Sequence, residues 1–547
     1  MPVLRRTLVD LHARSIGPAE VVVEGERIAS VRPLPAGTPV DAGFLMPGFV
    51  DAHVHVESSM LPPTEFARVA SRHGTVATVS DPHEIANVLG EEGLAFMLEE
   101  ASRACIPILF GVPSCVPATP FETAGATLDA KAVARLLADP RFGYLAEMMN
   151  WPGVLSGDPE VMAKIAAAKA VGKPVDGHAP GLRGEQAARY VAAGISTDHE
   201  CFELDEAREK ARLGMRILIR EGSAARNLDA LWRKVGEFPH LAMFATDDAH
   251  PDDLLVGHID RSVARCVAQG LDLFDVLRAA CVNPVEHYRL PTGLLRPGDR
   301  ADFIVVDDLR DFRVRETWIA GKPVARDGKS LAAPTPAKTP NAFRSARFAA
   351  GDFAFRTARP GPVTVRTIEV VDGQLVTGEG RAELSPRDGI LEPDAAGDTL
   401  LLAVVNRYAA APPALAFVRN VGLKRGALAS SVAHDSHHVV AVGADRASLA
   451  AAVNAVFASR GGLAVADGDA VELLPLPIAG LMSDRPAEEV AEAYGRLTSR
   501  AKALGSPLRA PFMTLSFLAL LVIPALKLGD RGLFDAREFR FVPVEVG

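Results

Sequence analysis

The chain has 547 residues, of which 48% are hydrophobic and 23% are charged, a balance that excludes a disordered protein and predicts roughly three to four folded units. The formal net charge is −9, without the dense Lys/Arg patch that neutralises a phosphate backbone, so we expect no nucleic acid partner. Five cysteines, never spaced as Cys-x-x-Cys, are typical of reduced thiols in a cytoplasmic protein. The longest apolar run, Met513 to Leu528, is too short to span a bilayer, so we expect no membrane segment.

Two segments at either side of the central part of the chain read as antiparallel strands. Ala19 to Val31 and Ala301 to Val324 alternate apolar and polar residues and are broken by turn residues. Neither segment is long enough to be stable alone, so we expect the two to pair with each other. Residues 1–45 and 293–330 would then form one small β-sandwich-like domain around an inserted unit.

Between these segments, residues 46–292 alternate short β-rich runs with longer stretches of helical period, the pattern of repeated strand–helix units. The eight β-rich runs are residues 49–56, 75–80, 106–112, 144–149, 174–178, 195–199, 215–220 and 241–247. Eight parallel strands, each followed by a helix, close into a (β/α)8 barrel. The predicted fold class is therefore α/β, with a TIM-like barrel inserted in the small β domain.

The remainder of the chain predicts a separate domain. Residues 331–343 are rich in Pro and Ala and read as a linker. Residues 344–547 mix strand-like runs such as TIEVVDG and HHVVAVG with the helix-like run ASLAAAVNAVFASRGG, which predicts a C-terminal α+β domain.

Ionisable side chains concentrate at the C-terminal ends of the predicted barrel strands, where such barrels place their active sites. In His53-Val54-His55 the two imidazoles have the two-residue spacing that points both to one face of a strand. Buried histidines and carboxylates are costly unless they are paired or bind a metal, so a set at five strand ends predicts a metal site. The candidate ligands are His53, His55, Glu147, His178, His199 and Asp247.

Imidazole and carboxylate ligands without thiolate favour Zn, Mn or Fe. Two ions bridged by a carboxylate would use all six candidates, and Glu147 is the natural bridge as the only acidic residue on its strand. Asp247 and Asp248 point to opposite faces by the same two-residue rule, and we take Asp247 as the inward one. We expect two divalent metal ions, with Mn as the first candidate and Fe or Zn as alternatives.

The run MPGFVDAHVHVESSM resembles the start of the amidohydrolase-superfamily barrel, and its ESSM is similar to adenine deaminases in particular. Further stretches with that resemblance cover nearly the whole chain: VSDPHEIANVLG, LAEMMNWPGV, VDGHAPGLRG, GISTDHE, ATDDAHPDDLLVGHID, LPLPIAGLMSD, PFMTLSFLALLVIP and LGDRGLFD. The resemblance implies a binuclear centre with these six ligands, and hydrolysis of adenine to hypoxanthine and ammonia by a metal-bound hydroxide. It also implies a homodimer. Many superfamily relatives carry a carbamylated lysine on the fourth strand, and Glu147 takes that place here.

Asp247, in contact with both metal and water, is placed to accept the proton of the water and return it to the departing amine. Three residues stay open as donors to the purine ring nitrogen. Glu57 lies two residues after His55, Glu200 follows His199 directly, and His83 lies in the turn after the second strand. Each could instead cap a helix or support a ligand from behind.

Two further regions are candidates for substrate binding. The run from Ser431 to His438 is rich in histidine, and it is either a solvated turn or a contribution of His434 and His437 to the purine pocket or to a subsidiary metal site. Arg220, after the seventh strand, is expected to line the pocket.

Two other functions compete with this reading. The same metal centre could open a cyclic amide or hydrolyse an N-acyl bond, because one fold supports many related reactions. A catalytically silent barrel could serve as an interaction scaffold. Release of ammonia from adenine separates the first from the prediction, and bound metal separates the second.

Overall fold

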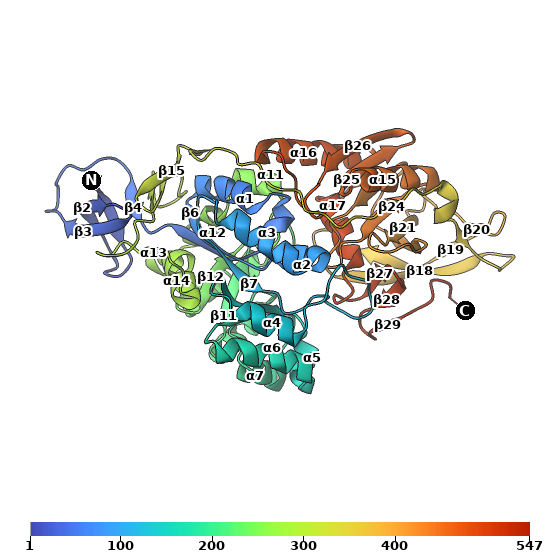
Figure 1. The fold of residues 1–547 in the computed structure, drawn as a ribbon, viewed down its shortest axis with the longest axis horizontal. Coiled ribbons are helices and arrows are strands. Elements are labelled where there is room, and N and C mark those ends of the chain that lie inside the picture. The colour runs from blue at the N-terminus through green and yellow to red at the C-terminus, as the bar shows by residue number, and fades with distance from the viewer. Residues whose placement is uncertain (1, 547) are drawn as a thin grey trace.

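The computed structural model describes residues 2–546 and sets three units side by side: a small N-terminal sheet, a central barrel and a C-terminal domain (Figure 1). The barrel lies between the other two units. No helix among residues 2–546 combines the length and the apolar character needed to cross a membrane.

Eight parallel strands form the barrel in the order that the sequence predicted. They are β5 (Phe49–Val54), β6 (Thr75–Ser80), β7 (Ile108–Val112), β8 (Phe142–Met148), β9 (Val175–Gly177), β10 (Thr197–Asp198), β11 (Arg216–Arg220) and β12 (Ala242–Ala245). Backbone bonds close the ring at two places: Ser196 N donates to Val175 O at 2.9 Å, and Asp247 N donates to His53 O at 2.9 Å. The predicted (β/α)8 barrel is confirmed, and β5 and β6 are buried along their whole length because side chains fill one face and helices cover the other.

Helices follow the barrel strands on the outside. They are α1 (Pro63–Ala70), α2 (His83–Leu89), α3 (Glu91–Ala101), α4 (Ala130–Leu137), α5 (Trp151–Ser156), α6 (Pro159–Ala170), α7 (Gly184–Ala192), α8 (Leu204–Arg212), α9 (Leu228–Leu231), α10 (Arg233–Glu237), α11 (Pro251–Val256), α12 (Ile259–Ala268), α13 (Leu273–Leu277) and α14 (Asn283–Tyr288). Helix α6 shows how particular residues begin and end these helices. The Asp158 carboxylate accepts from Val161 N at 3.0 Å, Pro159 begins the first turn, and Gly172 follows the last turn at φ +67°.

The segments on either side of the barrel share one eight-stranded sheet in the order β16-β15-β14-β13-β4-β1-β2-β3. Its strands are β1 (Val3–Asp10), β2 (Ser15–Glu24), β3 (Arg27–Pro33), β4 (Phe44–Met46), β13 (Phe303–Val306), β14 (Val314–Ile319), β15 (Lys322–Arg326) and β16 (Lys329–Ser330). The two predicted segments do not pair directly along their length, because β4 joins them by pairing parallel to β1 and antiparallel to β13. Three residues are too few to show an alternating pattern, so β4 could not be predicted from the sequence.

The C-terminal domain is built on a second eight-stranded sheet, in the order β19-β18-β22-β21-β24-β23-β25-β26, with two long helices and a three-stranded sheet. The main strands are β18 (Val363–Val370), β19 (Thr377–Leu384), β21 (Leu400–Val405), β22 (Ala414–Arg419), β23 (Ala427–Ser430), β24 (Val439–Gly443), β25 (Gly462–Asp467) and β26 (Ala470–Pro475). The two long helices are α15 (Arg446–Ala458) and α16 (Ala487–Ala503), and a short helix, α17 (Pro511–Ser516), follows them. The three-stranded sheet consists of β27 (Leu526–Gly529), β28 (Gly532–Asp535) and β29 (Arg540–Phe541). Two short strands, β17 (Phe355–Arg356) and β20 (Ile390–Leu391), pair with each other.

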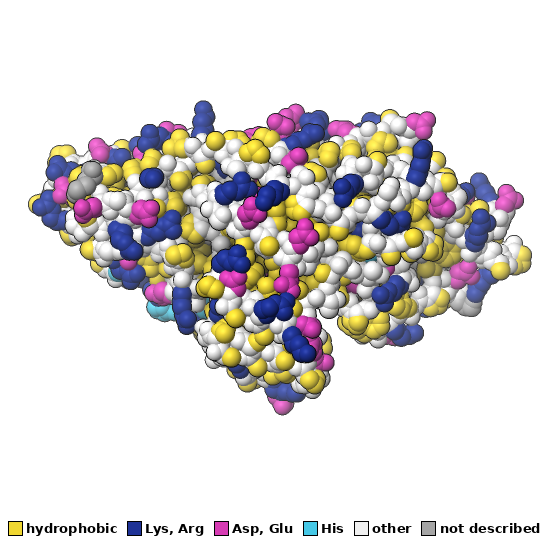
Figure 2. Space-filling view, in the orientation of Figure 1, with side chains coloured by type: hydrophobic (Ala, Val, Ile, Leu, Met, Phe, Trp, Pro, Cys, Tyr) yellow, Lys and Arg dark blue, Asp and Glu magenta, His cyan; other side chains and the backbone are white. Residues whose placement is uncertain are grey.

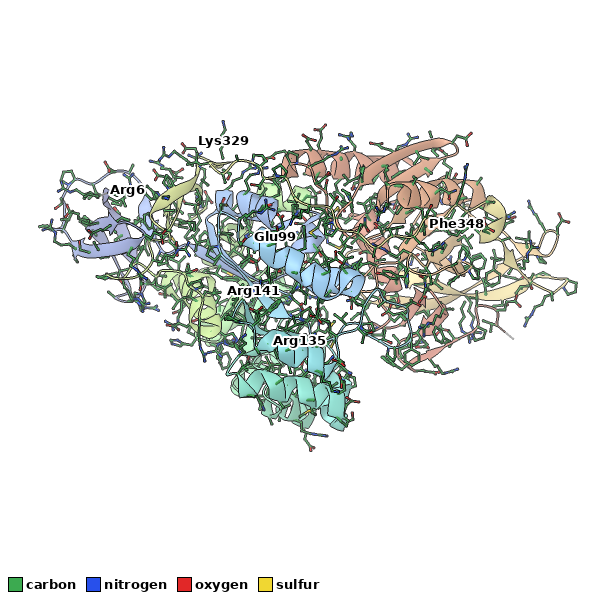
Figure 3. The ribbon with its side chains drawn as sticks, in the orientation of Figure 1. Arg6, Glu99, Arg135, Arg141, Lys329 and Phe348 are labelled. Carbon is green, nitrogen blue, oxygen red and sulfur yellow. The ribbon has the colours of Figure 1, made fainter. Side chains whose placement is uncertain are left out.

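The C-terminal domain packs against the barrel through specific contacts. Ser483 N donates to Met60 O at 2.8 Å, and the Tyr494 hydroxyl of α16 lies 2.6 Å from His250 Nδ1 beside α11. Lys338, in the extended segment between the two units, forms a 2.7 Å ion pair with Glu99 of α3, which Figure 3 labels. On the face shown in Figure 2, acidic and basic side chains are interspersed.

Candidate active site

A cavity lies between the C-terminal ends of the barrel strands and the C-terminal domain. The barrel contributes mainly polar side chains: His55, His83, Glu84, Glu147, Met149, His178, His199, Glu200, Asp247 and Asp248. The C-terminal domain contributes mainly apolar ones: Leu375, His434, Asp435, Phe517, Leu520, Val522 and Ile523. The cavity is therefore charged on one side and apolar on the other.

Five of the six predicted ligands line this cavity and the sixth, His53, lies beside Glu147 and Asp247, because each stands at or just beyond a strand end. Glu147 lies at their centre. Its Oε1 is 3.2 Å from His55 Nε2 and 3.8 Å from His53 Nε2, whereas its Oε2 is 2.7 Å from His178 Nδ1 and 3.3 Å from His199 Nε2. The two oxygens of one carboxylate thus face two separate pairs of imidazoles.

Asp247 completes the set on the side of the first histidine pair. Its Oδ1 lies 3.3 Å from His53 Nε2 and 3.2 Å from His55 Nε2. Its backbone adopts φ +58°, a left-handed conformation that is uncommon outside glycine and that clusters at functional sites. Asp248 also lines the cavity, and its Oδ1 accepts from Ser58 Oγ at 2.5 Å.

The residues fit a pair of divalent metal ions. Both ring nitrogens of His53 are buried without a hydrogen-bond partner in the part of the chain that the structure describes, an arrangement that is costly unless another group binds them. The donor set is four imidazoles and two carboxylates with no thiolate, which suits Mn, Fe or Zn. His55 Nδ1 lies 3.0 Å from the Asp81 backbone oxygen, the kind of second contact that orients a ligating histidine.

Arg220, which the sequence predicted in the pocket wall, lies behind it. The guanidinium is fully buried and is absent from the residues that line the cavity. Its Nη1 donates to Asp247 Oδ2 at 2.6 Å and also pairs with Glu200 Oε1, while Nη2 donates to Glu200 Oε2 at 3.2 Å. Arg220 therefore fixes two carboxylates of the cavity instead of presenting its own charge there. Coulombic attraction to Arg220 and hydrogen bonds from the histidines hold the pKa of Asp247 well below its usual range in spite of burial.

The three candidates for the ring-nitrogen donor are placed differently. His83 and Glu200 line the cavity, whereas Glu57 does not. Glu57 accepts from Ile85 N at 3.2 Å, and burial raises its pKa to about 7. His83 Nδ1 lies 3.0 Å from Asp81 Oδ2, so Asp81 supports both His55 and His83.

The histidine-rich run, residues 431–438, contacts the barrel through the carboxylate of Glu84. Glu84 accepts from His434 Nδ1 with one oxygen and from His437 Nε2 with the other. Ala433 N donates to His437 Nδ1 at 3.2 Å, so the His437 hydrogen is on Nε2 and points at Glu84. His434 lies at the cavity and His437 behind it, and with Glu84 they form a buried group whose ligand atoms are close enough to hold a metal ion. Coulombic attraction to the histidines holds the pKa of Glu84 well below its usual range despite burial.

Sequence reasoning did not single out Glu84 or the apolar side of the cavity. Glu84 follows His83 in the Asp-Pro-His-Glu turn after β6, and its position beside a candidate residue was the available signal. The apolar side comes from residues 375 and 517–523, which read only as buried hydrophobic chain. No periodic or ionisable pattern marks such residues as part of a site.

Comparison with known proteins identifies the family of the chain. The amidohydrolase family model matches residues 44–324, the barrel with most of its flanking sheet, and places the chain among the amidohydrolases. The model described as the adenine deaminase C-terminal domain matches residues 374–540. Adenine deaminase of Salinibacter ruber is 56% identical over 98% of this chain and 97% of its own length, and that of Sulfurovum sp. is 52% identical over 98% and 99%. Adenine deaminase of Methanosarcina barkeri is 52% identical over 92% of this chain and 93% of its own. The chain belongs to the adenine deaminase family, which confirms the resemblance seen in the sequence.

Proposed function

We propose that this chain hydrolyses adenine to hypoxanthine and ammonia at a centre of two divalent metal ions. Its family membership supports the substrate and the reaction. The observation that carries the metal centre is the Glu147 carboxylate, whose two oxygens face His53 and His55 on one side and His178 and His199 on the other.

His53, His55 and Asp247 would hold one ion and His178 and His199 the other, with Glu147 shared between them. The chemistry that such ions supply is a lowered pKa of coordinated water, which makes hydroxide available near neutral pH. Mn is our first candidate among the metals that this donor set accepts, with Fe and Zn as the alternatives.

The protein side chains move the protons. Asp247 has one oxygen toward the histidines and the other held by Arg220, which leaves its carboxylate fixed at the mouth of the barrel to accept a proton and return it to the amine. For the ring nitrogen we propose His83. Both oxygens of Glu200 already accept from Arg220, whereas His83 lines the cavity with its Nδ1 bonded to Asp81.

The C-terminal side of the cavity would bind the purine. Phe517, Leu520 and Ile523 present apolar surface to a flat ring, and His434 adds a polar group fixed by Glu84. A wall of this kind, opposite the catalytic groups, is the usual composition of a small-molecule pocket.

The test is to purify the protein from cells supplied with Mn and kept low in iron, measure bound metals, and assay ammonia release from a panel of purines, pyrimidines and cyclic amides. We expect about two metals per chain and turnover of adenine above all other compounds. Turnover of a cyclic amide without turnover of adenine would contradict the proposed substrate, and an active protein with one tightly held metal would contradict the shared centre.

A further inference from the structure

The apolar side of the cavity is made by two separate pieces of the C-terminal domain. Leu375 precedes β19, and Phe517, Leu520, Val522 and Ile523 follow α17. We call these five residues the apolar wall. Most of them belong to one hydrophobic cluster, which also contains Ala224 and Ala225 from the loop after β11 of the barrel. The position of the wall relative to the metal ligands therefore depends on how these two pieces are held together.

One buried lysine joins the two pieces. Lys527 lies on β27 and is 0% exposed, and its Nζ donates to Leu375 O at 2.6 Å and to Phe517 O at 2.9 Å. Each acceptor is the backbone of an apolar-wall residue. Further bonds next to this junction join Thr377 to Pro524, Ala525 and Leu526.

The ammonium has no acid to neutralise it. Burial is the one cause that lowers the pKa of Lys527 to about 7, with no coulombic contribution from a carboxylate among residues 2–546. An unpaired charge in an apolar interior is expensive, and an apolar side chain of similar length would fill the same space at lower cost. The contacts that the ammonium makes are thus the feature that distinguishes lysine from methionine at this position.

The wall is coupled to a polar group of the cavity. The Phe517 ring stacks on His434 with ring centroids 4.8 Å apart and an angle of 18° between the planes. A shift of the Phe517 backbone would therefore move both the apolar surface and the imidazole that Glu84 holds.

We propose that Lys527 is a positioning residue that clamps Leu375 and Phe517 and thereby sets how tightly, and how selectively, the cavity binds the purine base. The proposal rests on the proposed function. Lys527 touches no reacting atom, so its loss should weaken substrate binding far more than it slows the chemical step.

The test compares Lys527→Met with a matched control, Lys173→Met. Lys173 also donates to two backbone carbonyls, Leu137 O at 2.6 Å and Asp139 O at 2.9 Å, but on the outside of the barrel. We expect Lys527→Met to raise KM for adenine about tenfold, the scale of a lost hydrogen bond to a charged group, with kcat within about threefold of the parent. Its preference for adenine over 9-methyladenine should fall, while Lys173→Met keeps both values.

Two further variants keep the proposal open to refutation if the Met variant does not fold. Lys527→Arg should restore most of the affinity, because it donates to carbonyls, and Lys527→Gln, with a neutral amide, should be intermediate. An unchanged KM in any folded variant that lacks the ammonium would overturn the proposal, and so would an equal rise in Lys173→Met.

A measurement without turnover separates this proposal from the proposed function. Amide hydrogen exchange over residues 371–377 and 511–523 should be faster in Lys527→Met than in the parent. A parent protein inactive on adenine would refute the proposed function, whereas equal exchange rates in parent and variant would refute the clamp.

Discussion

The barrel and the C-terminal domain build opposite sides of one cavity by different means. On the barrel side, the ligands stand on or directly after strands, and backbone bonds join Asp247 N to His53 O at 2.9 Å and His55 N to Asp247 O at 3.0 Å. On the C-terminal side, Phe517 and Leu520 lie in short turns whose place depends on Lys527 and on packing against the barrel. The barrel therefore supplies the polar groups that can hold metal and move protons, and the C-terminal domain supplies most of the apolar surface.

The sharpest way to test the barrel half is Asp247→Asn, which keeps the shape and an oxygen ligand but cannot carry a proton. We expect turnover on adenine to fall by about 10²–10⁴-fold, the usual contribution of a positioned acid-base group. Ammonia release is measured after both metals are shown to be present. Near-normal turnover with intact metal content would show that another group carries the proton, and His83 would be tested next.

The contact between the barrel and the C-terminal domain is tested by Glu84→Gln. Removal of one partner from a buried ion pair costs about 3–5 kcal/mol, so we expect a lower free energy of unfolding at neutral pH by about that amount. The folded-state pKa of Glu84 lies below the unfolded value of 4.5, so its stabilisation is present above that pH and is lost as the pH falls through the folded pKa. The difference between parent and variant in denaturant unfolding should therefore shrink in acid, and a difference independent of pH would exclude an ionised Glu84.

The C-terminal half is tested by substrate size. Adenosine carries a ribose that the apolar wall leaves little room for, and even one misfitting methylene costs about 10–200-fold in specificity. We expect kcat/KM for adenosine to be lower than for adenine by at least about tenfold. Equal or faster turnover of the nucleoside would mean that the wall opens or faces another part of the ring.

The support behind the ligands is tested by Arg220→Gln. Outer partners of metal ligands typically contribute about 10–100-fold to metal affinity or activity, so we expect a loss of that size in metal affinity. Arg226→Gln is the control, because this nearby arginine is more than a third exposed and pairs with Asp253 at the surface. Metal titration followed by activity separates the two variants, and an equal loss in both would assign the effect to the loop as a whole.

The part of the structure that the sequence could predict is the part governed by short-range periodicity. Two-residue spacing placed His53 with His55, and the helical stretches between β-rich runs predicted the barrel. Arg220 shows the limit. An arginine at a strand end points toward the mouth of a barrel, yet sequence does not reveal that two carboxylates will take its donors before a substrate can.

Contacts between distant segments were out of reach for the same reason. Glu84 and His434 are 350 positions apart in the sequence, and Lys527 and Leu375 are 152 positions apart. Nothing in the local sequence of either partner records the other. The Pro- and Ala-rich linker and the mixed strand-like and helix-like runs after it predicted a separate C-terminal domain, but not which of its backbone atoms a lysine would hold.

The Glu84 contact has a consequence for the order in which the protein can become active. The barrel is complete in sequence by residue 292, yet an acid at its mouth has both oxygens bound by histidines from positions 434 and 437. A nascent chain that has released only its barrel from the ribosome would therefore hold the six ligands around an open, water-filled mouth with a bare carboxylate at its rim. Activity would begin only when the last part of the chain has been synthesised and has docked, so that the far end of the polypeptide governs when its first half starts to work.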